Sequence, residues 1–178
     1  QVNAWHENGL FLKGTRLAEP LTATVDLNRA VAGKELVVMA VPSHHLRTVA
    51  AAFSGTLEPG AAVLSVSKGI ENDTHLTMSG VLKETLGLAD DRLAVLSGPS
   101  FAVEVARRMP TVVTVASRKT ELARAVQRTF AAPYFRVYTS RDTLGVELGG
   151  ALKNVIAIAA GMVDGLGLGL NTRAALIT

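Results

Sequence analysis

The 178-residue sequence contains no cysteine, and aromatic residues make up only 4% of it. Without cysteine there is no disulfide framework, no thiolate metal site and no cysteine nucleophile. The sequence has 18 lysines and arginines and 15 aspartates and glutamates, so the formal net charge is only +3. Because nucleic-acid-binding proteins use concentrated positive charge and stacking rings, we expect no nucleic-acid partner.

Long hydrophobic runs are also missing. The longest apolar stretch without a charged residue, residues 155–163, is too short to cross a bilayer, so we expect no membrane insertion. No apolar segment of the secretory kind opens the chain, which predicts a cytoplasmic protein. Apolar residues make up 48% of the sequence, which is typical of a globular protein and excludes intrinsic disorder.

Five short runs rich in β-branched residues alternate with stretches of helical periodicity. The runs predict strands at residues 35–41, 62–66, 92–96, 111–116 and 135–138. The stretches between them predict helices at residues 44–53, 74–86, 101–107 and 120–131. The first four strands are continuous apolar runs, as buried parallel strands are. This order predicts an α/β protein with a mostly parallel sheet.

The pattern changes after the last predicted strand. Residues 142–163 predict one long helix, because apolar residues recur there at helical spacing. The glycines that follow lack the spacing of a dinucleotide-binding turn, so residues 161–169 predict a tight loop between helices. Near the start of the chain, residues 5–14 predict a loop and residues 23–27 a short strand. The sequence therefore divides near residue 140 into an α/β region and the start of a helical one.

Small or hydroxylated residues follow three of the predicted strands. These loops begin at Pro42, at Ser67-Lys68-Gly69 and at residues 97–100 (SGPS). Ligands of open α/β sheets bind outside the carboxyl ends of the strands, and hydroxyls and a lysine there suit a phosphate. The alternative is that these residues are the ordinary composition of turns. The pattern leaves both interpretations open.

Lys153 is the only charged residue between positions 148 and 163 of the predicted long helix. Its side of the helix otherwise carries glycine and alanine, which leaves room for a ligand. If the helix is buried, desolvation would lower the pKa of this lysine toward the range of a general acid/base. The alternative is a lysine whose ammonium reaches the surface from a close-packed helix. The adjacent histidines at 44 and 45 do not share a helix face, so we predict no metal site.

Three motifs together resemble a known enzyme family. They are residues 66–70 (VSKGI), 97–106 (SGPSFAVEVA) and 145–156 (GVELGGALKNVI), and they are similar to bacterial NAD(P)-dependent glycerol-3-phosphate dehydrogenase. The resemblance implies reduction of dihydroxyacetone phosphate to sn-glycerol 3-phosphate, for phospholipid synthesis, with NAD or NADP as cofactor. It also implies a homodimer and a small phosphorylated substrate as the partners.

The resemblance also implies roles for individual residues. Lys153 matches the family's general acid/base at the carbinol oxygen, and Lys68 matches a lysine that touches both substrate and cofactor. The remaining expected contacts are Gly98, Ser100 and Asn154 with the substrate, and Pro42 and Ala102 with the cofactor.

In terms of that family, residues 1–140 resemble a partial Rossmann-like dinucleotide-binding domain without its first strands. Residues 141–178 resemble the start of the helical substrate domain. The glycine-rich turn that holds the pyrophosphate is not among the 178 residues, so we expect this polypeptide alone to be inactive. The same region would distinguish NAD from NADP. Two alternatives remain: a non-catalytic interaction module of the same fold, and another Rossmann reductase with a helix-borne lysine.

Overall fold

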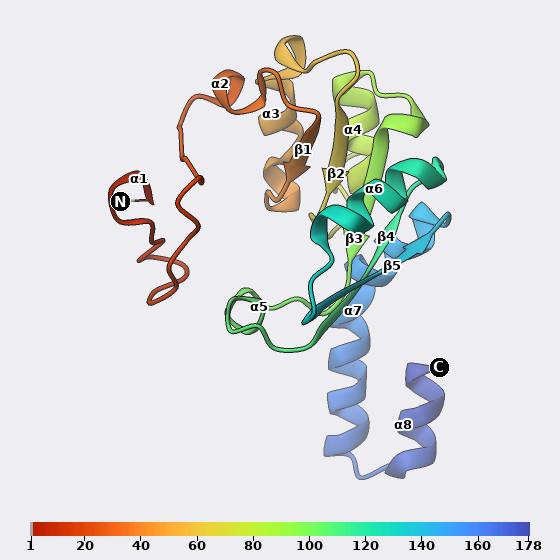
Figure 1. Ribbon diagram of the computed structural model, residues 1–178. Helices are drawn as coiled ribbons and strands as arrows, with labels where there is room; N and C mark the ends of the chain where they lie inside the picture. The colour runs from red at the N-terminus through yellow and green to blue at the C-terminus, as the bar shows by residue number, and fades with distance from the viewer. Residues whose placement is uncertain (1) are drawn as a thin grey trace.

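The computed structural model describes residues 2–178, whose centre is a five-stranded sheet in the order β1-β2-β3-β4-β5 (Figure 1). The strands are β1 Leu36–Met39, β2 Ala62–Ser65, β3 Leu93–Ser97, β4 Thr111–Ala116 and β5 Phe135–Ser140. Every neighbouring pair is parallel except β3 and β4, which are antiparallel. The predicted mostly parallel α/β sheet is therefore confirmed.

The direction of β4 corrects the interpretation of residues 111–116 as a strand parallel to its predecessors. Between β3 and β4 the chain contains only one short helix, α5 Ala102–Ala106. A parallel return needs a crossover that carries the chain back along the sheet, whereas this connection stays with α5 near the carboxyl end of β3 (Figure 1). The strand therefore returns beside β3 in the opposite direction, with Ser97 paired to Thr114.

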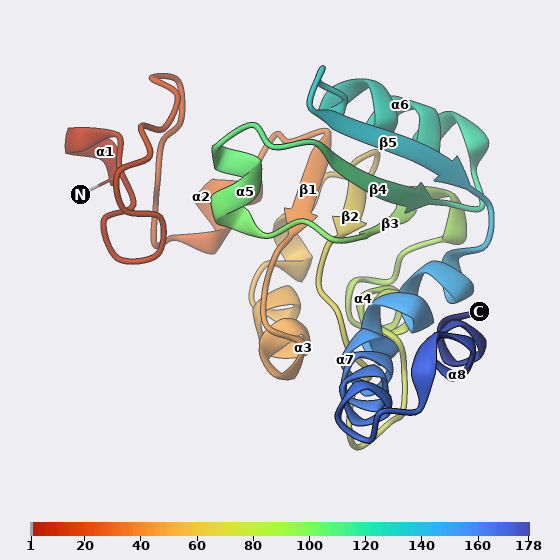
Figure 2. The same ribbon diagram turned by 90° about the horizontal axis from the view of Figure 1, so that it is seen from below.

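Helices cover both faces of the sheet, as Figure 2 shows. On one face lie α3 Leu46–Ala51 and α4 Met78–Leu86, and on the other lies α6 Thr120–Phe130. Each face of the sheet has its own hydrophobic core, and strand β2 contributes side chains to both, because successive side chains of a strand point to opposite faces. Its Val63 packs in the cluster around Leu46 and Leu82, whereas Leu64 packs with Val113 and Val126.

Several helices and loops begin or end at residues other than those predicted from the sequence. Residues 44–53 divide into a 3-10 turn, η1 Ser43–His45, followed by α3, and two further 3-10 turns are η2 Ser54–Thr56 and η3 Asp90–Arg92. The helix predicted from residue 74 begins only at Met78, because Ile70 and Thr77 form a β-bridge that closes the preceding turn. The predicted loop at 161–169 shrinks to residues 166–168, since the flanking helices extend into it.

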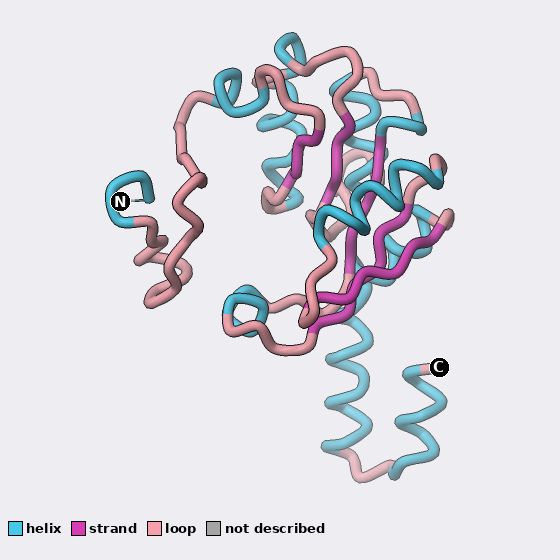
Figure 3. The backbone as a smooth tube through the Cα atoms, in the orientation of Figure 1, coloured by secondary structure: helices cyan, strands magenta, loops and turns pink. Residues whose placement is uncertain are grey.

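The N-terminal segment corrects the prediction of a strand at residues 23–27. Beyond the short helix α1 Val2–Trp5, the chain runs as a loop to α2 Leu27–Val31, as Figure 3 shows. Val25 is fully exposed, so its β-branched side chain has no sheet to pack against. Asp26 instead caps α2 by accepting a hydrogen bond of 3.1 Å from the Arg29 amide. The loop predicted at residues 5–14 is present from His6 onward.

The C-terminal part is a helical hairpin of α7 Thr143–Gly165 and α8 Gly169–Ile177. The first turns of α7 pack against β3 and β4, and the rest of the helix extends away from the sheet with α8 beside it (Figure 1). By length and composition alone, α7 could cross a membrane, which for a single helix is weak evidence. The absence of membrane insertion therefore stays a prediction.

Candidate active site

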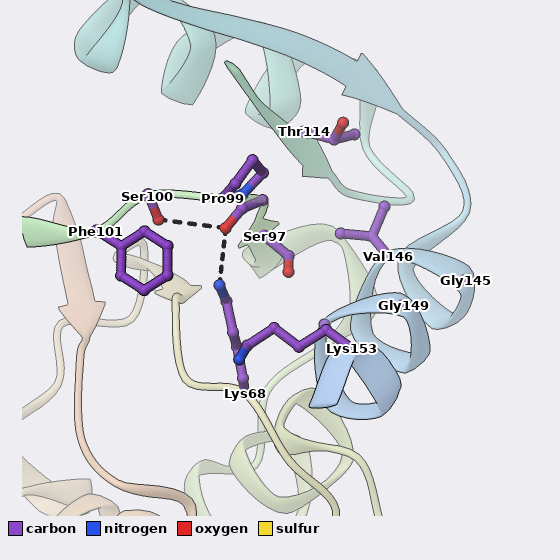
Figure 4. A pocket seen from close by; sticks show the side chains of 12 residues that line it. Lys68, Ser97, Pro99, Ser100, Phe101, Thr114, Gly145, Val146, Gly149 and Lys153 are labelled. Carbon is purple, nitrogen blue, oxygen red and sulfur yellow. Dashed lines mark hydrogen bonds between the residues drawn. The ribbon is translucent and has the colours of Figure 1, made fainter. Parts of the chain in front are cut away.

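A cavity of about 420 Å³ lies between the loops that follow β2 and β3 and the first half of α7 (Figure 4). Charged and polar groups enter it from four elements, and apolar side chains complete its wall. Residues that line it include Lys68, Gly98, Ser100, Thr114, Val146 and Lys153. The cavity lies at the carboxyl ends of β2 and β3, where the sequence predicted a ligand site.

Lys68 enters the cavity from the loop after β2 and is half-buried. Its Nζ donates a hydrogen bond of 2.8 Å to the carbonyl oxygen of Gly98, which also accepts the Ser100 hydroxyl at 3.4 Å (Figure 4). Burial lowers the pKa of Lys68 below its ordinary value, and the positive charge of Lys153 lowers it further. Lys68 is therefore easier to deprotonate than a surface lysine.

The backbone conformation and close packing at position 98 both require glycine. Its φ of +153° is one that residues with a side chain rarely adopt. A Cβ at this position would lie 2.8 Å from the carbonyl oxygen of Val112 and 2.9 Å from the Cα of Val113 on β4. The absence of a side chain lets the loop pass close to β4 and directs its carbonyl toward Lys68.

Two sets of contacts hold the loop that carries Lys68. On one side, the Ser67 hydroxyl donates to the carbonyl of Val41 at 2.5 Å, which joins the loops after β1 and β2. On the other side, Arg47 of α3 donates from Nε and from a terminal nitrogen to the two carboxylate oxygens of Glu71, at 2.9 and 2.8 Å. Hydrogen bonds from Arg47 and then Thr74 lower the pKa of Glu71 to about 2.

Replacing Glu71 by glutamine is expected to lower the free energy of unfolding at neutral pH, because the charge-assisted pair with Arg47 is lost. Since the native pKa of Glu71 is depressed, its contribution is complete above the ordinary value of 4.5. The contribution disappears as the pH falls from there through about 2. Urea unfolding of both proteins across this range should therefore show a stability difference that shrinks with acid. The matched change Glu35→Gln, at an exposed glutamate, should show no such convergence, and a constant Glu71 difference would contradict the assignment.

Lys153 reaches the cavity from α7, whose first turn is capped by the Asp142 carboxylate on the Gly145 amide at 2.8 Å. The side chain of Lys153 is exposed, and its Nζ donates to Oδ1 of Asn154 at 2.6 Å. The helix approaches the sheet closely one turn earlier, where a Cβ on Gly150 would lie 2.5 Å from the Ser97 hydroxyl. The glycine beside Lys153 therefore serves helix packing as well as leaving space for a ligand.

The structure brings four of the seven predicted site residues to one cavity: Lys68, Gly98, Ser100 and Lys153. Asn154 contacts Lys153 without lining the cavity. Pro42 lies in the loop after β1, and Ala102 is the first residue of α5; both are exposed and outside the lining. The roles assigned to all seven remain predictions.

Sequence reasoning missed Thr114 and Glu147. Thr114 lines the cavity from β4, and it was missed because only the ends of parallel strands were considered. The sequence feature that could have identified Thr114 is its hydroxyl in the middle of the apolar run of residues 112–116. Glu147 is a buried carboxylate on α7, and its signal is the only charged residue among residues 143–152 of an apolar helix. Residues 2–178 contain no group of three histidine or acidic side chains placed to hold a metal ion.

Comparison with known families agrees with this geometry. Residues 1–123 match the family described as NAD-dependent glycerol-3-phosphate dehydrogenase N-terminus, and residues 142–178 match the corresponding C-terminus. The NAD(P)+ glycerol-3-phosphate dehydrogenase of Geobacter metallireducens is 55% identical over 179 residues, which cover 100% of this chain and 53% of the relative. The chain thus spans about half the length of the curated relatives it matches.

Solved structures give the same result. A glycerol-3-phosphate dehydrogenase from Coxiella burnetii superposes with a TM-score of 0.85 at 34% identity, over 99% of this chain and 53% of that one. The enzyme of that name from Plasmodium falciparum gives a TM-score of 0.90 at 30% identity, over 98% and 49%. The resemblance read from the three motifs is confirmed, and the chain belongs to the NAD-dependent glycerol-3-phosphate dehydrogenase family.

Proposed function

We propose that the protein interconverts dihydroxyacetone phosphate and sn-glycerol 3-phosphate with NAD or NADP. The observation that carries the proposal is the convergence of two lysines, from separate elements, on one cavity whose lining includes no carboxylate. Family membership and the names of the relatives support the reaction and the cofactor class.

The charge of the cavity favours an anionic ligand. Within residues 2–178, neither Lys68 nor Lys153 forms an ion pair with a carboxylate. Two ammonium groups that face one cavity repel each other, and a phosphorylated ligand relieves this repulsion. Phe101 and Val146 give part of the wall an apolar surface that suits the flat face of a nicotinamide ring.

The cofactor, when bound, supplies the hydride that reduces the carbonyl carbon of the substrate. The ammonium of Lys153 gives a proton to the carbonyl oxygen, which becomes the hydroxyl of the product, and a neutral amine remains. In the reverse direction the neutral amine takes that proton back. Asn154 orients the Lys153 Nζ by accepting one of its hydrogens at 2.6 Å.

The other predicted residues act by binding. Lys68 holds substrate and cofactor through its ammonium, whose position is fixed by the carbonyl of Gly98. Gly98 and Ser100 contact the substrate, whereas Pro42 and Ala102 contact the cofactor.

Family membership also supports proposals for the domain division, oligomeric state, cellular location and metabolic purpose of the protein. We propose that residues 1–140 form part of a dinucleotide-binding domain and that residues 141–178 begin a helical domain. The protein acts as a cytoplasmic homodimer that supplies sn-glycerol 3-phosphate for phospholipid synthesis, without binding nucleic acid or inserting into a membrane. The change from sheet to helical hairpin after β5 supports the domain boundary.

Substrate specificity tests the proposed reaction. The natural full-length protein is expected to oxidise NADH or NADPH with dihydroxyacetone phosphate, as measured by the loss of cofactor absorbance. Dihydroxyacetone, which lacks the phosphate, should have a kcat/KM at least ~100-fold lower, because it forgoes charge-assisted hydrogen bonds. Equal values for the two ketones would contradict a phosphate-binding cavity. Binding of both ligands without turnover would instead indicate a non-catalytic module.

A further inference from the structure

Glu147 is a buried carboxylate whose partners belong to a distant part of the chain. It lies in the second turn of α7 and is 9% exposed. One carboxylate oxygen accepts the backbone N–H of Ser79 at 2.7 Å, and the other accepts the Ser79 hydroxyl at 2.6 Å. Ser79 belongs to the first turn of α4, so these bonds join the helical hairpin to a helix that covers the sheet.

The Glu147 carboxylate and the Ser79 amide each satisfy a polar group of the other that would otherwise lack a hydrogen-bond partner. The amides of the first turn of a helix have no intrahelical acceptor, and a buried carboxylate needs donors. At the start of α4, the Thr77 hydroxyl accepts a hydrogen bond from the Gly80 amide at 3.5 Å, and the Glu147 carboxylate accepts one from the Ser79 amide. Moving α7 away from α4 would leave both the carboxylate and the amide without these bonds, so the contact favours one position of α7.

Lys153 lies on the same helix, less than two turns after Glu147. Glu147, Gly150 and Lys153 follow one another at intervals of three residues, so each is a neighbour of the next on the helix surface, whereas Glu147 and Lys153 lie about 120° apart around the helix axis. Gly150 is the point of close approach to Ser97, and Lys153 reaches the cavity one turn later. Glu147 and Gly150 therefore hold the first two turns of α7 in place, and Lys153 lies on the turn that follows them.

We propose that Glu147 is a positioning residue. Its two hydrogen bonds to Ser79 fix α7 against α4 and thereby set the place of the Lys153 ammonium relative to Lys68 in the cavity. The kinetic consequence rests on the proposed function, because it assumes that Lys153 transfers the proton. The structural consequence, a fixed distance between two lysines, does not depend on it.

The kinetic test compares Glu147→Ala and Ser79→Ala in the natural full-length protein, with rates expressed per folded molecule. Glu147→Ala is expected to lower kcat ~10-fold with little change in KM, since misplaced reacting groups slow the chemical step. Ser79→Ala should have a smaller effect in the same direction, because the backbone N–H of residue 79 still reaches the carboxylate. Glu147→Gln, which keeps one acceptor oxygen, should partly restore the activity lost in Glu147→Ala.

Ser117→Ala is the matched control. The Ser117 hydroxyl is fully buried and donates to the carbonyl of Leu93 at 2.8 Å, at the end of β3 away from the cavity. The variant loses this bond and the one that its hydroxyl accepts from the Lys119 amide, just as Ser79→Ala loses the contacts of its hydroxyl with Glu147 and Thr77, and it should be less stable with an unchanged kcat. If Ser117→Ala and Ser79→Ala lower kcat equally, the effect of Ser79 is merely structural and the proposal is overturned.

A second readout does not require activity. Lysines labelled by reductive methylation with ¹³C can be titrated by NMR, and Lys68 should titrate below an ordinary lysine because of burial and the nearby Lys153. In Glu147→Ala, this pKa should move back toward the ordinary value as α7 moves away. An unchanged Lys68 titration together with an unchanged kcat would overturn the proposal.

The two readouts separate the positioning role from the proposed function. If the wild-type protein does not reduce dihydroxyacetone phosphate, the proposed function fails and the Lys68 titration alone decides the positioning role. If Glu147→Ala does not fold, the same titration in Ser79→Ala and Glu147→Gln decides it, and a wild-type Lys68 pKa in both would overturn the proposal.

Discussion

Replacing Lys153 by alanine in the natural full-length protein is expected to lower kcat by ~10²–10⁴, the usual contribution of a general acid/base. The KM for dihydroxyacetone phosphate should change much less, because Lys68 and the 97–100 loop still line the cavity. The physical reason is that the substrate oxygen must gain a proton as its carbon gains the hydride. Lys153 is held for this by Asn154, with 2.6 Å between Nζ and Oδ1. Steady-state kinetics with saturating cofactor measure both constants.

Two further variants separate proton transfer from charge. Lys153→Arg keeps the positive charge but cannot give up its proton near neutral pH, so substrate binding should persist while turnover is lost. Lys34→Ala removes an exposed lysine that lies outside the cavity lining and should leave both constants unchanged. Near-normal turnover in Lys153→Ala, or full activity in Lys153→Arg, would remove Lys153 from the catalytic role.

The convergence of Lys68 and Lys153 was predictable because it follows from strong local patterns. Continuous apolar runs marked the strands, and the rule that ligands bind at carboxyl ends of parallel strands pointed to the loop of Lys68. The isolation of Lys153 in an apolar helix marked it as unusual. The sequence left open whether Lys153 is buried or reaches the surface, because periodicity identifies an apolar helix without showing what packs against it; in the structure its side chain is exposed.

The features that were missed depend on contacts between distant residues. The antiparallel direction of β4 depends on its pairing with β3, and the apolar run of residues 111–116 is equally compatible with either strand direction. The segment 23–27 has β-branched residues, but no neighbouring strand is available to it, and Val25 is exposed. The bond between Glu147 and Ser79 joins residues 68 positions apart, which no local pattern in the sequence connects.

Replacing Lys68 by methionine is expected to lower kcat/KM for dihydroxyacetone phosphate by ~10–100-fold, mainly through KM. Methionine keeps much of the length of the side chain but removes a charge-assisted hydrogen bond, which is worth ~1.5–3 kcal/mol. The exposed Lys119→Met change, at a lysine outside the cavity, removes the same charge and should leave KM unaltered.

The pH dependence of KM provides the sharper form of this test. Because burial and the charge of Lys153 lower the pKa of Lys68, its ammonium becomes neutral at a lower pH than an ordinary lysine does. Below that pKa the charged form attracts the phosphorylated substrate, and above it the attraction is lost. The KM of the wild type should therefore rise as the pH increases through the pKa of Lys68, whereas Lys68→Met should have a high KM on both sides of it. A parallel rise in the variant would show that another group binds the anion.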